Sequence, residues 1–223
     1  LLILIVVAIV LLLSQQVTGT LNTYVYKDYF GKTGLLSIAG LLMTFCTFML
    51  APFVSKIVKR FGKKESVVVA TLTTSVFYLL LAVIHVQNVW VYLVLSLCAT
   101  FGAAFFNTIV WALVLDVIDY QELMTGHRSD ATIYAMYSFS RKIGQALAGG
   151  LGGFSLAFVG YVSSSGGEAV QQSAKTINNI YNLATLVPGI AYLMIAVIMA
   201  VFYPLTKNKL AEVTKILEER RNG

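Results

Sequence analysis

The sequence contains few charged residues. Asp, Glu, Lys and Arg together make up 12% of its 223 residues, compared with about a quarter in an average soluble domain. Apolar residues make up 58%, which is more than a soluble fold of this length can bury, and the same composition excludes a disordered chain. The sequence therefore predicts an all-α membrane protein with several membrane-spanning helices. The net charge of +6 is better explained by basic loops beside such helices than by a nucleic-acid partner.

Cysteine and histidine are scarce as well, with two of each. Cys46 and Cys98 lie inside apolar runs, as small core residues do, so we expect neither a disulfide framework nor a metal site. His85 and His127 lie at the ends of segments, away from both cysteines. Because no nucleophile–base arrangement with a histidine is recognisable, we predict that the protein is not an enzyme.

Six stretches are long and apolar enough to cross about 30 Å of hydrocarbon as helices. They are residues 1–26, 35–58, 67–86, 89–115, 133–162 and 180–203. A basic tail, residues 207–223, follows, and Leu210, Val213 and Leu217 fall on one face of it, as in a short helix at a membrane surface. The sequence begins inside an apolar run, without Met or a basic segment before it, so we expect a piece of a longer chain.

Lysine and arginine are distributed unevenly along this pattern. Most of them lie between the second and third stretches, between the fourth and fifth, and in the tail, whereas the opposite side has only Lys27, Lys32 and Lys175. Cytoplasmic loops carry the excess of basic residues in membrane proteins. We therefore expect a multi-pass protein of the plasma (inner) membrane, whose first helix runs outward and whose tail is cytoplasmic.

Polar side chains gather on the first, fourth and fifth predicted helices. Because polar groups in a bilayer face protein or water, we expect these three helices to line a wet cavity. The sixth helix is almost entirely apolar from residue 186 to 201 and is expected to support the others from the lipid side. Hydrogen bonding between helices is the alternative explanation for isolated Ser and Thr residues, but it does not suffice for a lysine.

Lys142 is the most informative of these polar residues. If the fifth helix begins near Asp130, Lys142 lies about 18 Å along it, near the middle of the bilayer. Tyr134, Ser138 and Gln145 share its face of the helix. This face offers a cation, hydroxyls, an amide and an aromatic ring, which suits a ligand with many hydroxyl groups. The alternative is a lysine that reaches back to the cytoplasm or pairs with an acid on another helix.

A mixed group of charges surrounds the start of the fifth helix, and segment 116–130 is expected to be a loop. Acids and bases at the inner edge of a membrane can close a gate through ion pairs and open it by exchanging partners. A solvated loop is the alternative explanation. The residues predicted for this cytoplasmic gate are Asp116, Asp119, Glu122, Arg128 and Arg141.

Several glycines follow Lys142 on the fifth helix. The pairs Ala148/Gly152 and Gly149/Gly153 place small residues four positions apart, which lets two helix backbones approach closely. We expect close helix packing here, or a flexible hinge.

Two motifs give the chain a family resemblance. The run D-x-x-D-Y-x-E begins at Asp116 and is followed by Gly126 and Arg128, and the stretch YSFSRKIGQALAGG begins at Tyr137. With these motifs the chain resembles the C-terminal six-helix half of a major facilitator superfamily transporter. More closely, it resembles the glycoside–pentoside–hexuronide:cation symporter family of the melibiose-carrier type. The stretch PFVSKIVKRFGKK from Pro52 is similar to the basic loop between the second and third helices of such a half.

The resemblance implies half of a twelve-helix fold. It implies a six-helix bundle over residues 1–206, made of two inverted three-helix repeats at about 1–86 and 89–203, and a cytoplasmic amphipathic tail at 207–223. The implied partners are a sugar or glycoside, the lipid bilayer, and either the missing N-terminal half or a second copy of the chain. The family's cation-binding carboxylates lie in the N-terminal half, so this half is expected to bind no cofactor, and the coupling cation, Na⁺ or H⁺, is expected in the other half.

The implied function is cation-coupled symport of a sugar or glycoside by alternating access. Lys142 stands where the family has a cavity lysine, whereas Asn107 replaces the family's Trp and Tyr137 with Ser138 replaces a Gln-Thr pair, so the sugar is expected to differ from melibiose. The alternatives are a facilitator-type exporter of an amphipathic compound, and a non-transporting membrane scaffold or receptor half. The predicted substrate-binding residues are Lys142, Ser138, Tyr137, Tyr134, Asn107 and Gln145.

Overall fold

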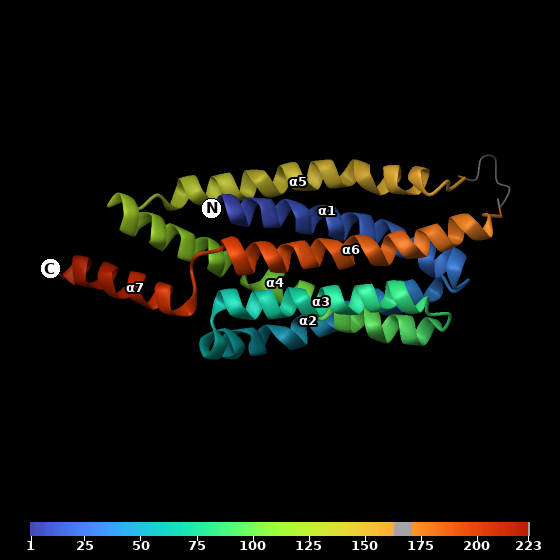
Figure 1. Ribbon diagram of the computed structural model, residues 1–223, viewed down its shortest axis with the longest axis horizontal. Helices are drawn as coiled ribbons and strands as arrows, with labels where there is room; N and C mark the ends of the chain where they lie inside the picture. The colour runs from blue at the N-terminus through green and yellow to red at the C-terminus, as the bar shows by residue number, and fades with distance from the viewer. Residues whose placement is uncertain (163–170, 223) are drawn as a thin grey trace.

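The computed structural model is an elongated bundle of helices that run back and forth (Figure 1) and describes residues 1–162 and 171–222. The basic turn between α2 and α3, the turn between α4 and α5, and α7 lie at the same end of the bundle, as the distribution of Lys and Arg predicts. The elements are α1 (Leu2–Tyr24), continued by a short π-helix η1 (Val25–Tyr29), α2 (Gly34–Phe61), α3 (Lys63–Ile84), α4 (Val89–Thr125), α5 (Asp130–Phe158), α6 (Ala174–Phe202) and α7 (Lys207–Asn222).

Five of the described helices are long and apolar enough to cross a membrane: α1 with η1, α2, α3, α4 and α6. Helices suit this environment because they satisfy their backbone hydrogen bonds internally. The remaining expected span, α5, has 29 residues and runs beside α1 (Figure 1). It is less apolar because it carries Arg141, Lys142 and several glycines. The expected six apolar spans are therefore confirmed for five.

The bundle is centred on α3, which packs against α4 and α6, while α1 packs against α5 and α6, and α2 packs against α4. Two hydroxyl groups of α3 tie these helices together. Thr74 Oγ1 donates to the carbonyl oxygen of Ala99 in α4 at 2.8 Å, and Ser75 Oγ donates to that of Gly189 in α6 at 2.7 Å. One side of the sixth helix is thus part of the packed interior, whereas its other side is apolar and exposed at Ile190, Met194 and Val197, as expected for a helix that supports the others from the lipid side.

α4 is longer than the sequence predicts. It continues through Thr125, so most of the expected loop at 116–130 is helix. At 1.5 Å per residue its 37 residues extend about 55 Å, well beyond the thickness of the hydrocarbon. Gly126, with φ of 74°, ends α4 in the left-handed conformation that glycine adopts without steric cost. The last turns of α4 therefore carry their acidic residues toward the end of the molecule where α7 lies.

α7 packs against this end of α4. Val213 and Leu217, which the sequence places on its apolar face, are both buried. Arg220 adds a hydrogen bond from its guanidinium to the carbonyl oxygen of Leu123 at 3.4 Å. The apolar face of α7 thus contacts protein, which corrects the expectation of a helix on the membrane surface. An amphipathic pattern alone does not distinguish these two partners.

α5 approaches α1 through small residues. Ala148 and Gly152 are buried, and a Cβ atom at Gly152 would lie 2.6 Å from Thr20 Oγ1 of α1, closer than real side chains pack. A Cβ atom at Gly153 would meet nothing within 4 Å. The predicted close packing is therefore confirmed for the Ala148/Gly152 pair, whereas Gly153 faces away from the neighbouring helices.

The contact at Gly152 gives the first prediction. Gly152→Val should lower the free energy of unfolding by about 1–3 kcal/mol, because the added methyl groups push α5 away from α1. Gly153→Val is the matched control, since it has the same effect on the backbone but finds open space. Thermal unfolding of both purified variants measures the difference, and equal melting temperatures would contradict this account of the α1–α5 contact.

Candidate functional site

Aromatic and cationic side chains of α4 and α5 meet around Trp111. Its ring stacks on that of Tyr134, with centroids 5.2 Å apart and planes at 27°, and meets Tyr137 edge-on at 5.5 Å and 84°. The guanidinium carbon of Arg141 lies 5.7 Å from the centroid of Trp111, within the range of cation–π attraction. Tyr137 is fully buried, whereas Tyr134 is 53% exposed. These four side chains, the Trp111 group, thus hold a cation beside a partly open aromatic surface.

Arg141 also lines a cavity between α1 and α5, here called the α1–α5 cavity. Residues 141, 145 and 148 share one face of α5, and residues 12, 15 and 16 share one face of α1. The guanidinium and three amide groups give the cavity both donors and acceptors of hydrogen bonds, and a guanidinium binds carboxylate and similar oxyanions with two parallel hydrogen bonds. The cavity has a volume of about 450 Å³ and is lined by Leu12, Gln15, Gln16, Arg141, Gln145 and Ala148.

The other predicted substrate residues lie outside these two groups. Lys142 is exposed and, within the part of the chain that the structure describes, makes no hydrogen bond or ion pair. Ser138 is half-buried. Asn107 is exposed, and its amide donates to the carbonyl oxygen of Ala103 in its own helix at 3.1 Å. Consecutive residues of a helix point about 100° apart, so Lys142 lies on a different face from Arg141.

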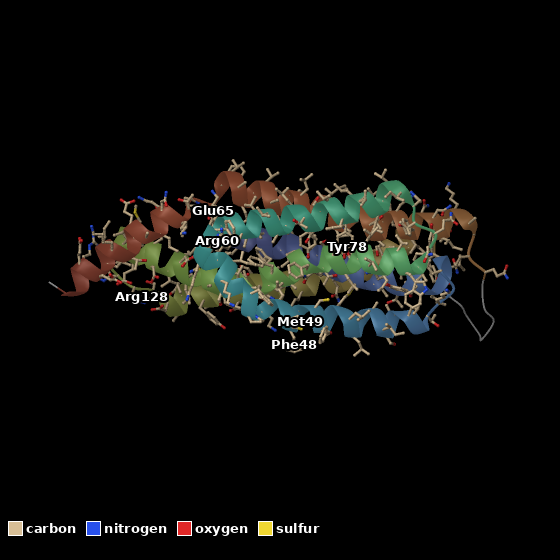
Figure 2. The ribbon with its side chains drawn as sticks, turned by 90° about the horizontal axis from the view of Figure 1, so that it is seen from below. Phe48, Met49, Arg60, Glu65, Tyr78 and Arg128 are labelled. Carbon is tan, nitrogen blue, oxygen red and sulfur yellow. The ribbon has the colours of Figure 1, made fainter. Side chains whose placement is uncertain are left out.

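Arg128 is the centre of an ion-pair network, the Arg128 cluster. Its Nη1 atom donates to Asp119 Oδ1 at 2.7 Å and to Glu122 Oε2 at 2.8 Å, and its Nε atom donates to Asp130 Oδ2 at 2.8 Å. Hydrogen bonds from the guanidinium to Asp119, Glu122 and Asp130 raise the pKa of Arg128 above its usual value. The network joins the end of α4 to the start of α5. Figure 2 shows Arg128 toward the end of the molecule where α7 lies.

Asp116 and Arg141, also predicted for the gate, have other partners. Asp116 is buried and accepts a hydrogen bond from Lys63 Nζ at the start of α3. Lys63 also donates to the carbonyl oxygen of Ala112 at 3.3 Å, so it ties α3 to α4. The guanidinium of Arg141 lies over Trp111 instead. Of the five predicted gate residues, three therefore form one ion-pair network: Asp119, Glu122 and Arg128. Asp130 is a further member of this network.

Several residues of the site were not selected from the sequence. The polarity of the first helix marks Gln15 and Gln16 as cavity-lining candidates, but only the contact with α5 shows that they face Arg141. Trp111 stands out as an aromatic residue on a polar helix, and its role depends on the same packing. Lys63 begins α3, directly after the α2–α3 turn, and nothing in the sequence connects it to Asp116. Among the described residues, no cluster of three or more His, Cys, Asp or Glu could hold a metal ion.

Comparison with known proteins places these features in a family. The chain matches the family described as MFS/sugar transport protein over residues 1–207. It is 31% identical over 207 residues to an uncharacterized symporter, YjmB, of Bacillus subtilis (strain 168), which covers 93% of this chain and 44% of the relative. It is 30% identical over 215 residues to a glucuronide carrier protein homolog of Escherichia coli (strain K12), with 96% and 46% covered. It is 34% identical over 187 residues to a putative 2,3-dihydroxypropane-1-sulfonate exporter of the same strain, with 84% and 39% covered.

The family match includes all of the helices from α1 to α6, and with them the Trp111 group, the α1–α5 cavity and the Arg128 cluster. The chain spans less than half the length of these three relatives. The family is one of membrane transporters rather than enzymes, in agreement with the membrane-spanning helices. The chain therefore belongs to the MFS/sugar transport protein family.

Proposed function

We propose that this chain is one half of a secondary active transporter that carries a sugar or glycoside together with Na⁺ or H⁺ by alternating access. The observation that carries the proposal is the α1–α5 cavity, in which a guanidinium and amide groups lie between helices of a sugar-transport family member. One relative is itself named a symporter. The coupling cation binds in the other half.

The packing of the helices supports a six-helix half built from two inverted repeats, at about 1–86 and 89–203. α1 packs against α5 and α6, just as α4 packs against α2 and α3, and α3 and α6 pack against each other. A two-fold relation that exchanges the first three helices with the last three produces this pattern. In this proposal α5 is the sixth membrane span, and a missing N-terminal half or a second copy of the chain forms the opposite wall.

The orientation of the proposed half follows from its basic end. The α2–α3 turn, the Arg128 cluster and α7 face the cytoplasm in the plasma (inner) membrane. In the proposed cytoplasmic unit at 207–223, α7 packs on α4 and contributes to the inner end of the transporter. The Arg128 cluster acts as part of the cytoplasmic gate.

The substrate is proposed to carry an acidic group beside its hydroxyl groups. Two relatives are named for a glucuronide and for a sulfonate, and both of these carry an anionic group. Arg141 is the cation that lines the α1–α5 cavity, with Gln145 one helical turn further along. Lys142 with Ser138 and Asn107 faces the opposite half, and Tyr134 and Tyr137 hold the aromatic surface.

Export is the second candidate function. One relative is named an exporter, and the lining of the α1–α5 cavity is equally suited to either direction of transport. A facilitator-type exporter would move its substrate without using a cation gradient, which gives a direct distinction from symport.

The proposal predicts gradient-driven uptake by the twelve-helix transporter. In vesicles we expect methyl β-D-glucuronide to accumulate when a Na⁺ or H⁺ gradient is directed inward, and to equilibrate when the gradient is collapsed. Residues 1–223 alone should not accumulate it, because the opposite half that would close the transport path is missing. Radiolabelled uptake measures this. If methyl β-D-glucuronide equilibrated across the membrane independently of both gradients, the result would favour a facilitator. If no sugar crossed the membrane, the result would contradict the proposal.

A second prediction separates Arg141 from its neighbour Lys142. Arg141→Gln should weaken binding of methyl β-D-glucuronide by about 10-fold or more, since a hydrogen bond to a charged group contributes about 1.5–3 kcal/mol. Binding of methyl β-D-glucoside, which has no acid, should change little. Lys142→Ala should weaken the binding of both ligands. Lys142→Arg should not restore this binding fully, because the planar guanidinium of Arg differs in shape from the compact ammonium group of Lys.

Equilibrium binding and thermal unfolding of the same variants measure these effects. If Arg141→Gln weakened both ligands equally, Arg141 would not be the anion site. If Lys142→Ala lowered the melting temperature and left binding unchanged, Lys142 would be a structural residue.

The Arg128 cluster gives a prediction for the gate. Arg128→Gln removes one cation from three carboxylates, and exposed ion pairs are worth up to about 1 kcal/mol each. We expect uptake to slow roughly 3- to 10-fold while binding of the ligand stays unchanged. The control is Lys209→Gln, which breaks one exposed pair with Glu212, at 2.9 Å, on α7. Equal uptake by both variants and the wild type would remove the cluster from the gate.

A further inference from the structure

A second cavity lies inside the bundle, here called the interior cavity, and the proposed site does not use it. Its volume is about 190 Å³, roughly six times the volume of one water molecule in the liquid. Its lining comes from α1, α2, α3, α4 and α6 and includes no charged side chain. Figure 2 shows Tyr78, one of the lining residues, about midway along the bundle. The residues that matter here are Ser14, Gln15, Thr18 and Gly19 of α1, Tyr78 of α3 and Tyr192 of α6.

Two hydroxyl groups of this cavity have no partner. Ser14 and Thr18 are 2% and 7% exposed, and neither hydroxyl makes a hydrogen bond within the described chain. Thr73, outside the cavity, and Thr100, in its wall, each donate to the carbonyl oxygen four residues earlier, at 2.9 Å, which is the usual bond for such residues in a helix. Because buried polar groups are nearly always paired, the free hydroxyls of Ser14 and Thr18 point to a bound polar group.

The remaining wall offers an amide and aromatic rings. Gln15 Nε2 donates to the Tyr192 hydroxyl at 3.4 Å, and the Tyr192 ring lies parallel to that of Tyr78 at a centroid distance of 6.5 Å and an angle of 9°. Gln15 lines both cavities, so the interior cavity adjoins the α1–α5 cavity that holds Arg141. Gly19 leaves open space, since a Cβ atom there would meet nothing within 4 Å.

We propose that the interior cavity is a second subsite that receives the uncharged, hydroxylated part of the substrate. This inference rests on the proposed transport of a sugar. Hydroxyl groups of the ligand bond to Ser14 and Thr18, and its apolar C–H surface lies against the aromatic wall. Gln15 stands between this subsite and Arg141, so a substrate with hydroxyls at one end and an acid at the other reaches both.

Variants that lack the hydroxyl groups test their role in the full transporter. Thr18→Val and Ser14→Ala should each weaken binding of both methyl β-D-glucoside and methyl β-D-glucuronide by about 2- to 10-fold, the effect of one neutral hydrogen bond. Neither should lower the melting temperature, because the wild-type hydroxyls have no protein partner to lose. Thr73→Val is the control, since it removes the hydroxyl of an exposed residue outside the cavity. Unchanged binding in Thr18→Val and Ser14→Ala, or a lowered melting temperature as the main effect, would overturn the subsite.

Protection from labelling tests the location. In a background with Cys46→Ala and Cys98→Ala, Gly19→Cys should react with N-ethylmaleimide, and each sugar should slow the reaction severalfold. Gly34→Cys is the control, because a Cβ atom there also meets open space and the residue lies at the start of α2. Uptake by the wild type without protection at Gly19→Cys would overturn the subsite and leave the proposed function standing. Failure of uptake together with failure of protection would overturn both.

Discussion

The close contact between α1 and α5 determines which polar side chains of the bundle meet. Gly152 lets the backbone of α5 lie against Thr20, where a Cβ atom would be 2.6 Å from the hydroxyl oxygen. Once the two helices are this close, the side chains on the same face of α5 must fit beside α1. Arg141 therefore lines a cavity with Gln15. Polar groups inside a bilayer face protein or water, and this contact places Arg141 and Gln145 of α5 in one cavity with Gln15 and Gln16 of α1.

Two pairs of buried hydroxyl groups in the bundle differ in their partners. Thr74 and Ser75 bond to backbone carbonyls of α4 and α6 and hold helices together, so they serve the fold. Ser14 and Thr18 are also buried but have no protein partner. A buried hydroxyl without a partner carries a cost that a structural role does not explain. The difference between the two pairs separates groups that stabilise the bundle from groups available to a ligand.

The fold class could be predicted from composition because a bilayer permits few structures. Local details required the packing. The apolar run of α4 stops at Asp116, which suggests a helix end, yet the helix continues to Thr125, and Lys63 of α3 compensates the buried carboxylate of Asp116. Arg141 and Lys142 are adjacent in sequence and equally deep, and only the position of α1 decides that Arg141 lines the α1–α5 cavity. The Arg128 cluster could be predicted in part, since its acids and its arginine lie within a few residues of one another.

The α4–α5 hairpin connects the proposed gate to the proposed site. α4 carries Trp111 and, about 12 Å further along the same helix, Asp119 of the Arg128 cluster. α5 carries Asp130 of that cluster and, about 17 Å further along, Arg141. The Arg128 cluster joins the two helices at the basic end of the bundle, and the Trp111 group joins them again further along. In the proposed alternating-access cycle, an exchange of partners by Arg128 would act on both of the helices that carry Trp111 and Arg141, and would so link the proposed gate to the proposed site.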